Sequence, residues 1–182
     1  EGFHVQAGAP HAEVHALRQA GDLPRGPTAY VTLEPCSHTG KTPPCANALI
    51  EAGVAEVICA MVDPNPQVAG QGLARLQAAS IHTAHGLLGE QAQALNRGFL
   101  SRIQRRRPFL TLKLAASLDG KTALANGDSQ WITGAAARAD VHKERAARNA
   151  IITGSGTVLA DNPQLNVRGV ACLKQPVRVV LD

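Results

Sequence analysis

The sequence predicts an α/β protein in which helices flank a parallel β-sheet. Helical and strand-like segments alternate at short spacing over residues 10–84, an order that favours parallel strands joined by crossover helices. A basic run then ends a helical segment near residue 107, and a new strand-like pattern begins at 108. We therefore expect two domains, one over residues 1–107 and one over residues 108–182.

The first domain is predicted to supply three strands and several helices. Helix 10–20 begins with Pro10, which suits a first helical position, and helix 45–52 is closed by Gly53. A longer helix carries Ala92, Leu95, Phe99 and Ile103 on one face. The remaining expected elements are strands at 29–33, 56–62 and 81–84, a helix at 72–79, the long helix at 89–103, a turn at 21–27, and loops at 35–44 and 63–66.

The second domain is predicted to begin with a strand at 109–115 and a tight turn at Asp119-Gly120. Thr133 is placed as the N-cap of a helix over 134–147. A strand at 150–153 is followed by a glycine-rich turn at 154–157, and residues 177–182 form a core strand with no closing partner. Both ends of the chain look cut from something longer.

Composition excludes several classes of protein. The chain lacks a run of eighteen apolar residues, so we expect no membrane-spanning helix. With only three Phe, one Tyr and one Trp it lacks the aromatic cluster of a base-stacking surface, so we expect no nucleic-acid partner. The net charge is +4. The basic run Arg102 and Arg105-Arg106-Arg107 could contact a phosphate, but a solvated stretch is the favoured interpretation.

The four cysteines follow no hydrophobic signal segment, so they are better explained as metal ligands or buried apolar groups than as disulfides. His11, Cys36 and Cys45 together make a three-ligand zinc set with one tetrahedral position left for water. Glu13 lies two residues from His11, where it could take a proton from that water. Taken singly, His11 could be a helix-terminal histidine and the thiols buried apolar groups. His15 is interpreted as a helix-face residue, and Cys59 and Cys172 as structural.

The order H-x-E, then Pro-Cys after a strand, then Cys at a helix start is similar to that of zinc nucleobase deaminases. Eight residues separate Cys36 from Cys45, however, where that pattern has two. The longer loop is itself recognisable. Together the segments 11–17, 34–45, 63–70, 112–121, 129–133 and 153–163 closely resemble the bifunctional riboflavin-biosynthesis deaminase–reductase family.

This resemblance implies a cytidine-deaminase-like three-layer α/β/α domain, followed by the start of a dihydrofolate-reductase-like α/β domain. It implies zinc-dependent hydrolytic deamination of 2,5-diamino-6-(5-phosphoribosylamino)pyrimidin-4-one, and then NADPH-dependent reduction of the ribosyl group to ribityl. Gly154-Ser155-Gly156 is not a Rossmann fingerprint, because Leu159 stands at its last glycine position.

By the same resemblance, His11, Cys36 and Cys45 bind Zn2+ and Glu13 shuttles protons. Substrate contacts are implied for His4, His38, Lys41, Lys113, Ser129, Arg145, Leu165 and Arg168. NADPH contacts are implied for Ala115, Trp131, Thr157 and Asp161. From the residues alone, His38 and Lys41 could equally be solvated loop residues, and Trp131 a core aromatic.

The family has a further helix and strand before residue 1 and continues well beyond residue 182. We therefore expect an internal fragment that is inactive as a reductase, from a cytoplasmic protein that is a homo-oligomer when full length. Two alternatives remain open: a deaminase with a non-catalytic second domain, and a zinc-stabilised nucleic-acid-binding module.

Overall fold

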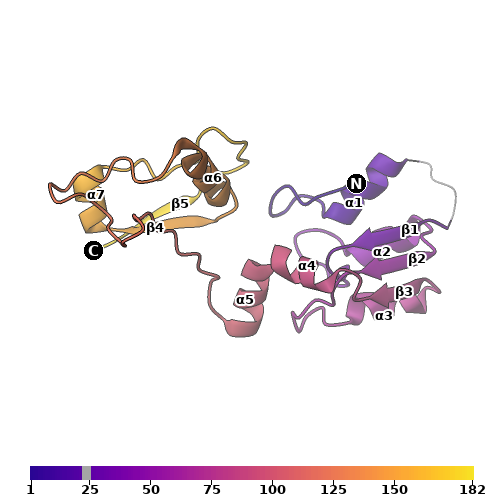
Figure 1. Cartoon of the computed structure of the whole chain (residues 1–182). Coiled ribbons are helices and arrows are strands. Elements are labelled where there is room, and N and C mark those ends of the chain that lie inside the picture. Colours follow the sequence, from indigo (N-terminus) through magenta and orange to yellow (C-terminus); the bar gives the residue numbers. More distant parts are fainter. Residues whose placement is uncertain (22–25) are drawn as a thin grey trace. The chain divides into compact units, whose positions relative to one another are not determined.

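The computed structural model describes residues 1–21 and 26–182 (Figure 1). It divides into two compact units, Glu1–Thr111 and Leu112–Asp182, and each is described here by itself. The turn predicted over 21–27 falls largely on residues 22–25, outside the described residues. Within the described residues, no helix combines the length and the apolar character that crossing a membrane requires.

A three-stranded parallel sheet forms the centre of the first unit. Strands β1 (Thr28–Val31), β2 (Glu56–Cys59) and β3 (His82–His85) lie side by side in that order, with β2 in the middle. Helices α2 (Cys45–Glu51) and α3 (Gln71–Ala78) connect them as crossovers. The predicted parallel α/β architecture is confirmed; β1 and β2 are shorter than the apolar runs suggested, and β3 has the predicted length.

Helices α1 (Ala12–Ala20), α2 and α3 pack around one apolar core. Leu49 of α2, Leu76 of α3 and Val57 of β2 are at most 2% exposed, and Leu17 of α1 packs against the same cluster. Burying a large aliphatic side chain of this kind contributes about 1.5–3 kcal/mol. This core fixes the first turns of α1 and α2 in the same unit, and those turns carry the residues of the site described below.

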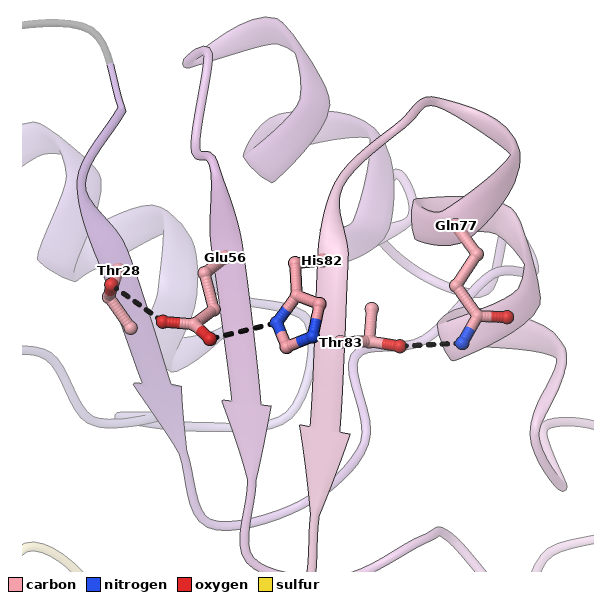
Figure 2. Close-up of polar contacts among 5 residues, drawn as sticks. All are labelled: Thr28, Glu56, Gln77, His82 and Thr83. Atoms are coloured by element: carbon pink, nitrogen blue, oxygen red, sulfur yellow. Dashed lines mark hydrogen bonds and ion pairs between the residues drawn. The ribbon is translucent and has the colours of Figure 1, made fainter.

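A row of polar side chains ties the three strands together at their first residues (Figure 2). Glu56 is the central member, because its two carboxylate oxygens face both neighbouring strands. Thr28 Oγ1 donates to Glu56 Oε2 over 3.0 Å, and His82 Nδ1 lies 2.8 Å from Glu56 Oε1. A slip of one residue would turn these side chains to the other face of the sheet, so the row helps to specify the register.

The single helix predicted over 89–103 is wrong. Two helices, α4 (Gly89–Leu95) and α5 (Arg97–Arg105), occupy this stretch and break at Asn96. The Asn96 side-chain amide donates to the carbonyl of Ala92 over 2.9 Å, in addition to its own backbone N–H. Asparagine competes in this way with the regular helical hydrogen bonds, and the periodic apolar pattern gave no sign of it.

The second unit contains α6 (Ala135–Ala146), β4 (Ala150–Gly154), α7 (Ser155–Asp161) and β5 (Val177–Leu181). The predicted turn at Asp119-Gly120 is confirmed by the bond from Gly120 N–H to the Ser117 carbonyl. The strand at 150–153 is also confirmed. The last strand was expected to lack a partner and to be buried. Instead β5 pairs with β4 in parallel, and most of its side chains are exposed.

Three other local predictions for this unit are wrong. Residues 109–115 form no strand, and Leu112 is 82% exposed; among the described residues no neighbouring strand supplies the hydrogen bonds that would hold one. Helix α6 is capped by Gly134, in extended backbone, while the Thr133 carbonyl accepts from Arg138. The glycine-rich segment after β4 is the start of α7, with Gly154 as its N-cap.

Candidate active site

Three metal-binding side chains from distant parts of the first unit meet at one point. His11 is the N-cap residue of α1, Cys36 lies in the loop after β1, and Cys45 is the first residue of α2. His11 Nδ1 lies 3.0 Å from Cys45 Sγ and 3.6 Å from Cys36 Sγ. The possible ligand atoms of all three lie within 4.8 Å of one another.

This donor set fits a zinc ion. Zinc bonds of about 2.3 Å to sulfur and about 2.0–2.1 Å to nitrogen, in tetrahedral geometry, place neighbouring donor atoms about 3.5–3.8 Å apart. The 3.6 Å from His11 Nδ1 to Cys36 Sγ falls within that range, and the 3.0 Å to Cys45 Sγ is about half an ångström shorter. One nitrogen and two sulfurs also leave a fourth position, as catalytic zinc sites do.

The hydrogen bond between the two thiols shifts their pKa values in opposite directions. The hydrogen bond from Cys45 lowers the pKa of Cys36 to about 5, helped by the Cys45 backbone N–H at 3.3 Å and by His11. The same hydrogen bond, together with burial, raises the pKa of Cys45. The charge of Glu13 raises it further. Glu13 lies in the first turn of α1, two residues after His11.

Thr42 contacts the far side of the His11 ring. Its Oγ1 lies 3.4 Å from His11 Nε2, while Nδ1 faces the two sulfurs. A partner on the second ring nitrogen is how proteins orient a metal-binding histidine. The sequence analysis missed Thr42, because nothing in a Lys-Thr-Pro-Pro loop marks the threonine as a partner of a histidine 31 residues earlier.

A cavity of about 280 Å³ opens beside the ligand set. The predicted substrate residues His4, His38 and Lys41 all line it, so the structure brings them together with His11 and Cys36. The His4 and His11 rings meet edge to face with centroids 5.2 Å apart. The complete lining is His4, Ala7, Gly8, His11, Cys36, His38, Gly40, Lys41 and Thr42.

Asp63 is a second residue that the sequence analysis missed, since residues 63–66 were predicted only as a loop. Its side chain is buried, and burial raises its pKa; the charges of Glu34 and Cys36 raise it further, while that of His38 lowers it. Asp63 Oδ1 accepts from the Asn65 N–H over 2.8 Å. The detectable signal was the Asp-Pro-Asn-Pro sequence directly after a buried strand, where binding residues of parallel sheets lie.

In the second unit, Arg145 and Arg168 lie close enough to interact. Burial lowers the pKa of Arg145, and the charge of Arg168 lowers it further. Both reach the same loop: Arg145 Nη1 donates to the Asn166 carbonyl over 3.1 Å, and Arg168 Nη1 to Asn166 Oδ1 over 2.6 Å. Among the described residues neither guanidinium is paired with a carboxylate. Leu165, the predicted neighbour, lies in this loop with φ +49°.

Among the described residues, none of the other predicted residues of this unit lines the cavity found in it. Trp131 is 69% exposed under the Arg138 guanidinium, 4.4 Å from the ring centroid, and so is not a core aromatic. Ala115 and Ser129 are half-buried, and Lys113, Thr157 and Asp161 are exposed. A cavity of about 510 Å³ in this unit is lined by residues that the sequence analysis did not select, namely 146–149, 171–175 and 177.

Each unit matches a known family model. Residues 1–61 match the model of the cytidine and deoxycytidylate deaminase zinc-binding region, and residues 108–182 match the RibD C-terminal domain. Over all of this chain, the riboflavin biosynthesis protein RibD of Escherichia coli K12 is 57% identical. Both units are thus similar to parts of RibD proteins. RibD of Bacillus amyloliquefaciens is 53% identical, again over the whole chain.

Solved RibD structures have the same fold. Acinetobacter baumannii RibD superposes on 98% of this chain with a TM-score of 0.91 and 53% identity, and the chain covers 52% of that structure. A second match is a Thermotoga maritima protein described as a diaminohydroxyphosphoribosylaminopyrimidine deaminase and 5-amino-6-(5-phosphoribosylamino)uracil reductase. Its structure superposes on all of this chain with a TM-score of 0.90 and 44% identity, and the chain spans 52% of that structure. The chain spans about half the length of the curated RibD relatives, 53% for Escherichia coli and 49% for Bacillus amyloliquefaciens. These matches confirm the predicted cytidine-deaminase-like domain followed by a reductase-type domain.

Proposed function

We propose that the first unit is a zinc-dependent deaminase that acts on a phosphoribosylated aminopyrimidine, 2,5-diamino-6-(5-phosphoribosylamino)pyrimidin-4-one, in riboflavin biosynthesis. The observation that carries this proposal is the meeting of His11, Cys36 and Cys45 beside the cavity, with Glu13 two residues after His11 in the first turn of α1. The deaminase and RibD matches support the same substrate class.

Each part of the site has a task in this reaction. Zinc held by His11, Cys36 and Cys45 would supply a water whose pKa is lowered to about 7. The Glu13 carboxylate takes the proton of the attacking water and passes it to the departing amine, so that ammonia leaves as oxygen replaces nitrogen on the ring. On the cavity wall, Lys41 offers a point charge to the ribose phosphate, and His4 and His38 offer ring nitrogens to the pyrimidine or the phosphate.

The second unit is proposed to contribute to an NADPH-dependent reductase that converts the ribosyl group to ribityl. Its match to the RibD C-terminal domain supports this assignment, and Arg145 and Arg168 provide unpaired cationic charge for the substrate phosphate among the described residues. The four predicted NADPH residues do not line the cavity of about 510 Å³ in this unit.

The test of the deaminase proposal is Glu13→Gln, which keeps the size of the side chain and removes the proton acceptor. The variant should retain about one zinc per chain and lose about 10²–10⁴-fold in the rate of ammonia release from the pyrimidine. Glu51→Gln is the matched control, because Glu51 is an exposed glutamate at the end of α2. A zinc-loaded Glu13→Gln protein with the parent's rate would refute the role of Glu13, and a zinc-loaded parent that releases no ammonia would refute the function.

A further inference from the structure

Glu34 is buried inside the first unit, two residues before Cys36. The residue is only 4% exposed, and its carboxylate is fully occupied as a hydrogen-bond acceptor. All four donors are backbone N–H groups from one stretch of chain. Oε2 accepts from Asp63 at 3.1 Å and Gly70 at 2.9 Å, and Oε1 from Gly72 at 2.8 Å and Leu73 at 3.3 Å.

Such an arrangement is costly unless every partner is present. Burying a carboxylate is strongly unfavourable without hydrogen bonds that satisfy it, and here both oxygens are satisfied by one segment, 63–73. That segment includes the first residues of α3. Glu34 therefore joins the chain that leads to Cys36 to a segment that begins about thirty residues later.

Two further contacts hold the neighbours of Cys36 against α3. A Cβ on Gly72 would lie 1.9 Å from the carbonyl oxygen of Pro35, so only glycine allows the two backbones to approach this closely. Beyond the cysteine, Arg75 Nη1 donates to the Ser37 carbonyl over 2.9 Å. The residues on both sides of Cys36 are thus fixed by α3 and the loop before it.

We propose that Glu34 is a positioning residue for the metal centre, which holds Cys36 Sγ in place against His11 and Cys45. The same hydrogen bonds join metal binding to the order of segment 63–73. This inference deepens the proposed function and rests on it, since it takes the three-residue set to be a zinc site.

The direct test is Glu34→Gln in the intact protein. Glutamine has nearly the same shape as glutamate, so it creates no void. Its amide NH₂, however, faces two backbone N–H groups and cannot accept their hydrogen bonds. Losing an outer partner of a ligand typically weakens metal binding 10–100-fold, and we expect a zinc Kd raised by that factor in competition with a chromophoric chelator. The absorption bands of the cobalt-substituted protein should also change, because they report the geometry at the sulfurs.

Glu56→Gln is the matched control. Glu56 also accepts two side-chain hydrogen bonds in the first unit, but it does so at the first residues of the strands (Figure 2). This variant should lose stability and keep the parent's zinc Kd and cobalt spectrum. If Glu34→Gln behaves in the same way, Glu34 is only structural and the proposal is overturned.

Gly72→Ala disrupts the close approach of α3 to the Pro35 carbonyl without removing the Glu34 carboxylate. It should weaken zinc binding at least tenfold, whereas Gly98→Ala in α5, where an added Cβ meets nothing within 4 Å, should not. Equal zinc Kd values for these two variants would contradict the proposal.

A measurement on the parent protein covers the case in which the variants fail to fold. Zinc should slow hydrogen exchange at the amides of Gly70, Gly72 and Leu73, and unchanged exchange there would overturn the coupling. Zinc affinity and exchange are read without substrate. A zinc-loaded parent that lacks deaminase activity would therefore refute the proposed function and leave this inference to be judged on the metal data.

Discussion

Alkylation of Cys36 in the zinc-free protein should depend only weakly on pH between pH 6 and pH 8. The perturbation is the removal of zinc by a chelator, which leaves Cys36 as a thiolate that accepts hydrogen bonds from Cys45, with a pKa lowered from 9.0 to about 5. An ordinary thiol becomes about tenfold more reactive with each pH unit in this range, because its thiolate fraction rises tenfold.

The size of the effect follows from two opposing factors. At pH 6 a thiol of pKa 5 is about 90% thiolate and one of pKa 9 about 0.1%, a ratio of about 900. A thiolate of lower pKa is intrinsically less nucleophilic, by about 60-fold for four pKa units at a Brønsted slope of ~0.45. Cys36 should therefore react about 15-fold faster than an ordinary thiol at pH 6 and about fivefold slower at pH 8.

The assay is iodoacetamide labelling at several pH values, followed by mass spectrometry of the peptide that contains Cys36. The same chain unfolded in denaturant provides the ordinary thiol, since its hydrogen bonds from Cys45 are lost. Zinc should abolish the labelling of Cys36. A labelling rate that rises tenfold per pH unit in the folded, zinc-free protein, parallel to the unfolded chain, would refute the arrangement of the two sulfurs.

Two further predictions concern stability. Leu76→Ala removes a fully buried side chain from the core of the first unit and should lower its free energy of unfolding by about 2–5 kcal/mol, measured by urea titration with hydrogen exchange at β2. Leu95→Ala, at a site that is 71% exposed, should change it by less than about 0.5 kcal/mol, and equal losses would contradict the assigned core. In the second unit, burial and the nearby Arg145 and Arg168 lower the pKa of His142 below 6.5. The contribution of His142 to stability is therefore present above pH 6.5 and is lost as the pH falls through the lowered pKa. In the His142→Gln variant, the free energy of unfolding should depend less on pH in this range. A variant with the same pH dependence as the parent would contradict the prediction.

The metal-binding residues were predictable because their chemistry is carried by residue type and by position in local elements. A histidine at a helix start, a Pro-Cys after a strand and a cysteine at the next helix start can each be recognised over a few residues. The role of Glu34 could not be found in this way, because its partners are backbone amides 29–39 residues later. Backbone amides carry no sequence signal, and only the folded loop shows that they converge.

The errors have a common physical origin in missing tertiary information. Alternating leucines at 110, 112 and 114 predicted a strand, but a strand is stable only with a neighbour to receive its hydrogen bonds. The break at Asn96 depends on where one side-chain amide turns. By contrast, the helices predicted at 45–52 and 72–79 lie within one residue of the bounds of α2 and α3, because the signals that start and stop a short helix are local.

The eight residues between Cys36 and Cys45 show why an unusual spacing does not move the ligands. The Cys45 N–H donates to Cys36 Sγ over 3.3 Å, and the Ala46 N–H donates to the Cys36 carbonyl over 3.1 Å, so the two ends of the loop are joined directly. Because these bonds close the loop at its base, its length can change while the sulfurs keep their separation. The extra residues are then available for another purpose, and in this chain they place His38 and Lys41 on the wall of the cavity.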